Sequence, residues 1–295
     1  MVPIKTIKIS ENPNEDWDLS EKGHTVWIDQ SSYYAYATIQ HRLSTAFFTA
    51  ELATIAGYDK PFKIDVFVPA AALFKFKSSD PETPFDRIEK WIMAMEPTRC
   101  PLLIRMYVYA ADSYPSLGYS DSFNCVWPLK KPDVTRGYYI TYQPYELYGS
   151  LGKFGSTPNY STRNELGYRL QERVLDEANR LGIEVIKTDY TMSFDEAVAE
   201  ISGSLGHFSY FGSTYYIAAA LGVQSYIFGY LKSPIKIIEH IDGNWWPSPW
   251  GGNKVTQIKI DSNNGIREIF NAPVGGFSHI ETYKDVRERL KECCP

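Results

Sequence analysis

Cysteine is scarce in this sequence, because only four cysteines occur in 295 residues and none belongs to a Cys-x-x-Cys pair. Such pairs mark many zinc and redox sites, so neither a zinc site nor a disulfide framework is indicated. Three further signatures are missing, namely His-Glu-x-x-His, Gly-x-Gly-x-x-Gly and the Walker sequence. The sequence therefore disfavours zinc, nicotinamide and ATP chemistry, and we expect no required metal or cofactor.

Long apolar runs and an excess of basic residues are missing as well. No stretch is long and apolar enough to cross a bilayer, and the first residues lack the apolar region of a signal peptide. The chain has 30 Lys and Arg against 35 Asp and Glu, so it has no general attraction for nucleic acids or anionic membranes. We expect no membrane insertion and a cytoplasmic location, in the host cytoplasm if the protein is viral.

The second half alternates between β-like runs and amphipathic helices. Ser193-Phe194-Asp195-Glu196 has the spacing of a capping box at the start of one of these helices. The expected strands are 137–143, 183–187, 207–211 and 223–228, and the expected helices are 162–181, 193–201 and 214–221. This order predicts a parallel sheet covered by helices, followed by a hairpin at 255–270 and a final helix at 283–293.

The first half shows a rougher form of the same alternation. Strands are expected at 25–29, 63–69 and 101–110, and helices at 34–56 and 84–95, with Pro84 just inside the second helix. Between the halves, residues 112–136 are rich in proline and glycine, which is typical of a connection. Because 295 residues exceed the usual size of one domain, we expect two domains, 1–130 and 131–295.

Gly212-Ser213-Thr214 lies between an expected strand and the next helix. In parallel α/β sheets ligands gather at the carboxyl ends of strands, and a helix N-terminus presents unpaired N–H groups that suit a phosphate. The alternative is that Ser213 or Thr214 merely caps the helix.

The segment FGSTYYIAAALGVQSYIFG, residues 211–229, resembles the C-terminal part of GT-B glycosyltransferases, especially the heptosyltransferase-like group. The resemblance implies an α/β fold with two Rossmann-like domains that face a central cleft. The domain 1–130 would bind the acceptor, and the domain 131–295 would bind a nucleotide-sugar donor. The chain departs from the family pattern by having Ser213-Thr214-Tyr215-Tyr216 where Asp-Ser-Gly and a His are frequent.

The expected donor-binding residues lie in the second domain. Lys153 and Arg163 would offset the diphosphate charge, although each alone is equally a solvated residue. Tyr190 could bracket a nucleobase, but packing is the alternative that we favour for it. His207 we expect to be a hydrogen-bonded core histidine. The donor-binding set is Gly212, Ser213, Thr214, Lys153, Arg163, Gln143 and Tyr190.

A general base is needed for an inverting transfer, and two carboxylates follow expected strands of the first domain. Asp29 is the last residue of the expected strand 25–29, at the position where the resembling enzymes often carry their acid–base residue. Asp112 follows 101–110. We rank Asp29 ahead of Asp112, and the alternative for both is an ordinary loop carboxylate.

The acceptor is less constrained by the sequence. Trp245, Trp246 and Trp250 could stack on a sugar or an extruded base, or could simply cover a domain edge. The leading hypothesis is a sugar transfer to a hydroxymethylated base in viral DNA, although a pI near 5.6 argues against DNA binding. The alternatives are a glycan or lipopolysaccharide acceptor, a nucleotide-sugar epimerase, and a non-catalytic nucleotide- or glycan-binding module.

Overall fold

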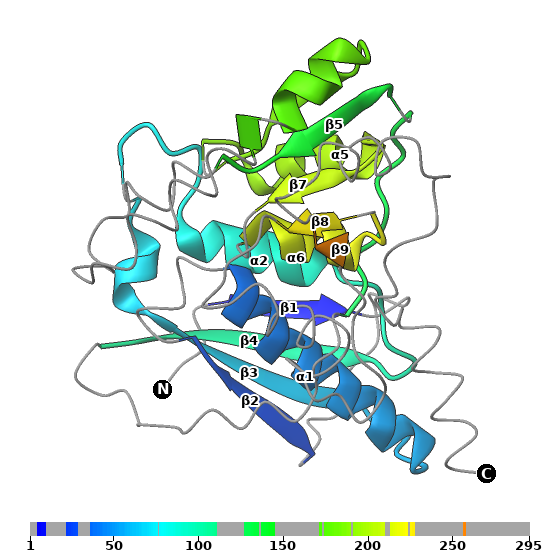
Figure 1. Cartoon of the computed structure of the whole chain (residues 1–295). Coiled ribbons are helices and arrows are strands. Elements are labelled where there is room, and N and C mark those ends of the chain that lie inside the picture. The colour runs from blue at the N-terminus through cyan, green and yellow to red at the C-terminus, as the bar shows by residue number, and fades with distance from the viewer. Residues whose placement is uncertain are drawn as a thin grey trace. The chain divides into compact units, whose positions relative to one another are not determined.

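The structure is a computed structural model of the chain (Figure 1). It describes residues 5–9, 22–28, 36–75, 77–110, 127–135, 137–144, 171–172, 174–189, 191–209, 213–223, 225–227 and 256–257. These residues divide into two compact units, the first ending at Lys130 and the second beginning at Lys131.

The first unit is built on a mixed four-stranded sheet. Its order is β1-β4-β3-β2, in which β2, β3 and β4 are parallel and β1 is antiparallel to β4. The elements are β1 (Lys5–Ile9), β2 (Gly23–Trp27), α1 (Tyr36–Ile55), β3 (Phe62–Pro69), the 3-10 turn η1 (Ala70–Leu73), α2 (Pro84–Ala94) and β4 (Leu102–Tyr109). The three strands and two helices expected in this half are confirmed within a few residues, whereas β1 was not predicted.

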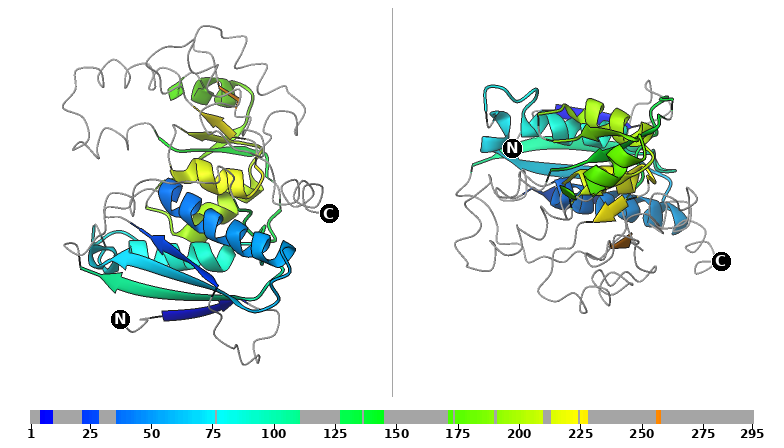
Figure 2. Two further views of the ribbon diagram at one scale, coloured as in Figure 1. Left: turned by 90° about the horizontal axis from the view of Figure 1, so that it is seen from below. Right: turned by 45° about the horizontal axis from the view of Figure 1, so that its top comes forward.

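Helices α1 and α2 cover one face of this sheet (Figure 2). The parallel strands β2, β3 and β4 lie next to one another in chain order, so the chain crosses the sheet in one direction. Right-handed crossovers then place both connecting helices on the same face. Ile64, Val66 and Val68 of β3 point to this side and are fully buried, with Phe47 of α1 also in the core. The alternation of buried and half-buried residues along β3 follows from the two-residue period of a strand.

The opposite face of the first sheet bears charged and aromatic side chains. Arg105 binds Asp65 on the neighbouring strand through two hydrogen bonds of 2.9 and 3.1 Å. The rings of Trp27 and Phe67 stack at 4.1 Å between centroids, and Phe67 stacks on Tyr107 at 4.9 Å. These rings turn their faces toward one another, so the row is a cross-strand ladder that stabilises the sheet.

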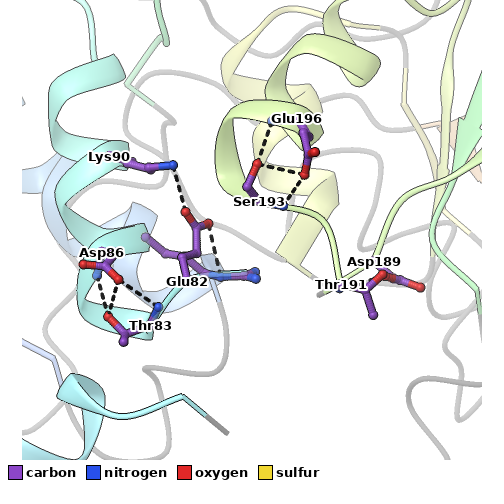
Figure 3. A network of polar contacts seen from close by, with 9 residues as sticks. Glu82, Thr83, Asp86, Lys90, Asp189, Thr191, Ser193 and Glu196 are labelled. Carbon is purple, nitrogen blue, oxygen red and sulfur yellow. Dashed lines mark hydrogen bonds and ion pairs between the residues drawn. The ribbon is translucent and has the colours of Figure 1, made fainter. Parts of the chain in front are cut away.

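Helix α2 begins with a capping box that the sequence analysis did not predict (Figure 3). The Thr83 hydroxyl accepts a hydrogen bond from the Asp86 N–H at 3.1 Å, and the Asp86 carboxylate accepts one from the Thr83 N–H at 2.9 Å. Pro84 occupies the first turn, as expected. Asp at the third position is a less usual partner than Glu or Gln, so this capping box lacks the common sequence signature.

The second unit contains a five-stranded parallel sheet with the order β6-β5-β7-β8-β9. Its elements are β5 (Tyr139–Tyr142), β6 (Glu184–Lys187), α5 (Phe194–Gly203), β7 (His207–Ser209), α6 (Ser213–Ala220), β8 (Ser225–Ile227) and β9 (Thr256–Gln257), and residues 171–172 and 174–180 are helical. The four strands expected between 137 and 228 are confirmed, as are both later helices. Strand β9 is parallel to β8, and the rest of the expected hairpin and the final helix lie outside the described residues.

In chain order these strands run 2-1-3-4-5, one of the two common orders of doubly wound α/β sheets. The chain moves from β5 to β6 in one direction and then returns past β5 to β7. Right-handed crossovers therefore place the helix at 171–180 on one face and α5 and α6 on the other. The core of the first face comprises Ile140, Val174, Ala178, Ile183 and Phe208.

Helix α5 begins at the capping box expected from the sequence (Figure 3). The Ser193 N–H donates to the Glu196 carboxylate at 2.8 Å, and the Ser193 hydroxyl accepts from the Glu196 N–H at 3.3 Å. On the sheet side of α5, the Tyr139 hydroxyl of β5 donates to the Glu200 carbonyl at 2.9 Å. Every second residue of β5, counted from Tyr139, therefore lies on the face of the sheet that α5 and α6 cover.

Candidate functional site

Strands β5 and β7 lie side by side at the point where the winding of the second sheet reverses. Thr141 is in register with His207, and Tyr142 with Phe208. The Gln143 N–H donates to the Phe208 carbonyl at 2.7 Å, so the ladder continues and sets Gln143 beside Ser209. In open α/β sheets, ligands bind outside the carboxyl ends of the strands at this kind of position.

A buried chain of polar side chains connects these two strands with the first turn of α6. We call it the polar chain, and it consists of Thr141, His207, Thr214 and Gln143. Thr214 Oγ1 lies 2.8 Å from His207 Nε2 and donates to Gln143 Oε1 at 2.8 Å, while His207 Nδ1 lies 3.0 Å from Thr141 Oγ1. All four side chains are buried away from water, so they satisfy their hydrogen-bonding groups by bonding to one another.

The geometry assigns the protons along this chain. Thr214 has one hydroxyl proton, which it donates to Gln143 Oε1 at 2.8 Å. The neighbouring His207 Nε2 then donates to Thr214, so the N–H of the neutral imidazole is on Nε2. With this tautomer, Nδ1 accepts from the Thr141 hydroxyl.

His207 is neutral at physiological pH. Its burial lowers its pKa to about 3, because the imidazolium would lose its hydration without gaining a charged partner. The expectation of a hydrogen-bonded core histidine is thus confirmed.

Ser209 ends β7 beside Gln143 and is fully buried. It is two residues after His207, so its side chain shares the face that α6 covers. Its hydroxyl has no hydrogen-bond partner among the described residues. Buried hydroxyls almost always have a partner, and the exception stands at the carboxyl edge of the switch point.

The first turn of α6 is held to β5 through Thr214. The hydroxyl of Thr214 has one proton, which goes to Gln143, so we expect this side chain to position the helix. Ser213 is the first residue of α6. Its backbone is described, but its side chain is not.

The structure brings Gln143 and Thr214, two residues of the expected donor-binding set, into direct contact. Of Ser213 only the backbone is described, and the remaining expected site residues lie outside the described residues: Asp29, Asp112, Lys153, Arg163, Tyr190, Gly212, Trp245, Trp246 and Trp250. Thr141 and Ser209 were not predicted. The available signal was a polar residue at every second position, Thr141 and Gln143 in one strand and His207 and Ser209 in the other.

A second polar turn follows β6 (Figure 3). Asp189 accepts a hydrogen bond from the Thr191 N–H at 2.8 Å and pairs with Lys187 at 3.0 Å. Burial raises the pKa of Asp189, but the hydrogen bonds from Thr191 and Lys187 outweigh burial and leave the pKa below its usual value. The carboxylate satisfies its own turn, which is a structural role.

Among the described residues, no group of three or more His, Cys, Asp or Glu side chains is arranged to hold a metal ion. The described helices are all too short or too polar to cross a membrane. The sequence matches no protein-family model, and a search of curated proteins finds no match.

Proposed function

We propose that the second unit binds the phosphate-bearing part of a nucleotide sugar between the carboxyl ends of β5 and β7, and that the protein is a glycosyltransferase. The observation that carries the proposal is the polar chain, because it fixes the first turn of α6 to β5 at the switch point. Doubly wound sheets bind their ligands at this place, and the first N–H groups of a helix suit a phosphate. The resemblance of residues 211–229 to GT-B glycosyltransferases supports sugar transfer as the reaction.

In the proposed reaction, an acceptor hydroxyl attacks the anomeric carbon and the nucleoside diphosphate leaves. Asp29 or Asp112 accepts the hydroxyl proton, and Asp29 is our first choice. The first turn of α6, with Lys153 and Arg163, stabilises the negative charge of the leaving diphosphate, so no metal is required. This mechanism needs two separate parts of the chain, one for each substrate.

The proposed acceptor is a hydroxymethylated base in viral DNA, with Trp245, Trp246 and Trp250 stacking on the base or the sugar. A glycan or lipopolysaccharide is the alternative acceptor. An epimerase would act on the same donor without any acceptor, and a binding module would hold the donor without reaction.

The test is a thermal-shift panel of nucleotide sugars, followed by mass spectrometry of acceptors incubated with the best donor. A glycosyltransferase is stabilised by one donor class and releases nucleoside diphosphate together with a glycosylated acceptor. Conversion of the sugar without acceptor indicates an epimerase, and stabilisation without any reaction indicates a binding module. Absence of stabilisation by every donor would overturn the proposal.

A matched pair of variants ties the binding to the switch point. Thr214→Val removes the hydroxyl that holds α6 to β5 and keeps the shape of the side chain, whereas Thr214→Ser keeps the hydroxyl. We expect Thr214→Val to weaken donor binding at least tenfold and Thr214→Ser to retain it within a few-fold. Equal affinity in both variants would separate the donor site from the polar chain.

A further inference from the structure

The segment that follows β3 exposes apolar side chains beside basic ones. Phe74 is 69 % exposed, more than any other large apolar side chain of the described residues, and the adjacent Leu73 is 41 % exposed. Lys75 and Lys77 are exposed as well. We call these four residues the aromatic–basic turn. Single exposed apolar residues are common, but an adjacent pair of them beside lysines indicates a surface that binds a partner.

Local hydrogen bonds hold this turn in place at both ends. Only Ala72 of η1 is buried, and the Phe74 N–H donates to the Ala71 carbonyl at 3.2 Å, where η1 ends. Further along the chain, the Lys77 N–H donates to the Asp80 carboxylate at 2.9 Å, and the Asp80 N–H donates to the Lys77 carbonyl at 3.0 Å. Binding at the turn therefore requires little further ordering of the chain.

The acidic side chains near the turn are withdrawn from its surface. Residues 70–79 contain no Asp or Glu. The next two acidic residues, Asp80 and Glu82, are only 5 % and 7 % exposed. Glu82 also lies 2.9 Å from Lys90 Nζ and 3.4 Å from Arg87 Nε, so basic side chains of α2 balance its charge. The turn is therefore a local basic surface on a chain whose net charge is -5.

The turn lies at the carboxyl edge of the first sheet. Strand β3 ends at Pro69, in register with Tyr109 at the end of β4, and η1 begins at the next residue. Strand β2 ends at the same edge, because it is parallel to β3. Asp29, the first choice for the general base, follows the last residue of β2 by two positions in the sequence. An acceptor that reaches this edge of the sheet can contact the turn.

We propose that the aromatic–basic turn binds the acceptor nucleic acid, with Phe74 stacking on an unpaired base and Lys75 contacting a backbone phosphate. The inference rests on the proposed function and names acceptor-binding residues of the first unit. Aromatic side chains that stack on bases, together with basic side chains that contact phosphates, are the common means of binding single-stranded nucleic acid.

Two other partners fit the turn less well. A neutral glycan could stack on Phe74 but would gain nothing from the charge of the lysines. A lipid surface is normally bound by the long apolar face of an amphipathic helix, whereas here the exposed apolar part is confined to Leu73 and Phe74. Two adjacent side chains match the size of one base.

The first experiment measures binding of a fluorescently labelled single-stranded thymidine oligonucleotide to the full chain at low salt, by fluorescence anisotropy. We expect Phe74→Ala to weaken binding about 5- to 100-fold, the usual effect of losing one stacked base, and Phe74→Tyr to retain it within about threefold. Tyr138→Ala is the matched control, because Tyr138 is an aromatic residue of the second unit that is 65 % exposed. This control should change affinity less than about threefold. Because Phe74 is exposed, its variants should keep the melting temperature of the wild type.

The phosphate contact is tested by the salt dependence of the same binding. Lys75→Ala should reduce the slope of log affinity against log salt by about 0.7 to 1, the contribution of one phosphate contact. Lys60→Ala is the control, because Lys60 is also exposed but precedes β3 at the opposite edge of the sheet. An unchanged slope in Lys75→Ala would remove this residue from the inference.

The outcomes separate the inference from the proposed function. If the oligonucleotide does not bind, or binds Phe74→Ala as well as the wild type, the inference is overturned, while stabilisation by a nucleotide sugar would leave the proposed function standing with another acceptor. Binding of phosphatidylserine vesicles that Phe74→Leu retains, without oligonucleotide binding, would likewise overturn it in favour of a lipid surface. Oligonucleotide binding that depends on Phe74, in a protein that no nucleotide sugar stabilises, would retain the nucleic-acid surface and reject the glycosyltransferase.

Discussion

The two sheets of this protein differ in where their polar side chains lie and in how deeply these are buried. In the first unit, the described parallel strands are added in one direction, both helices cover one face, and the charged pair Arg105–Asp65 lies on the other face. In the second unit, the winding reverses between β5 and β7, helices cover both faces, and the polar chain is buried beneath α6. Open α/β sheets bind ligands at the carboxyl edge beside such a reversal, and of the two sheets only the second has a reversal among its described strands.

This difference has an energetic consequence. When a partly exposed ion pair breaks, water can replace the lost partner at little cost, whereas a hydrogen bond broken in a buried neutral chain is not replaced. The second unit should therefore respond more strongly than the first to single polar substitutions and to acid.

The largest expected effect is the loss of stability in acid. The pKa of His207 is about 3 in the folded protein and near 6.5 in the unfolded chain, so the unfolded chain takes up a proton that the folded protein excludes. Stability contributed by this difference is complete above pH 6.5 and falls by about 1.4 kcal/mol per pH unit as the pH drops toward 3. Urea denaturation at a series of pH values measures it.

The control for this prediction is His207→Gln, which lacks the titrating ring. Its free energy of unfolding should be lower at neutral pH and should change less with acid between pH 6.5 and 3. An identical pH slope in both proteins would show that His207 is not the residue responsible.

Thr214→Val should give the next largest effect. The variant keeps the volume of the side chain but leaves His207 Nε2 and Gln143 Oε1 without the partner that joins them. We expect a loss of about 3 kcal/mol in the free energy of unfolding, since two buried polar groups are left unsatisfied. Thr214→Ser, which keeps the hydroxyl, should lose less than about half of this amount. A loss below about 1 kcal/mol in Thr214→Val would mean that water reaches the polar chain.

The two capping boxes offer a matched comparison between the units. Thr83→Ala and Ser193→Ala each remove one helix cap, and each should cost about 1 kcal/mol. Hydrogen exchange should show faster opening of α2 in the first variant and of α5 in the second. If either substitution loosens both helices equally, the two units share one cooperative unfolding transition.

The smallest effect is expected at the ion pair of the first sheet. Arg105→Met keeps an apolar stem and removes the bond to Asp65, whose side chain is only 14 % exposed. We expect a loss of about 0.5 to 1 kcal/mol that shrinks in high salt, as is usual for partly exposed pairs. A loss as large as that of Thr214→Val would remove the energetic contrast between the two sheets.

Most elements could be predicted from the sequence, because the strands are β-branched or aromatic runs and the helices carry an apolar stripe. The capping box at Ser193 could also be predicted, because its two residues lie only three positions apart in the sequence. Strand β1 escaped prediction because Lys5–Ile9 is short and is held at the sheet edge by pairing with β4, a partner almost 100 residues away in the chain. Local patterns contain no information about such a partner.

The sequence by itself determined where most strands and helices lie, and that a helix begins close to Thr214, soon after the strand that contains His207. Tertiary structure alone decided the strand order, and with it the neighbours of the site. Ser209 and Gln143 are more than 60 residues apart and become adjacent only because the chain returns past β5 after β6. The hydrogen bonds that join Thr141, His207, Thr214 and Gln143 likewise exist only because the fold brings these side chains together, since each of them could donate or accept elsewhere in another fold.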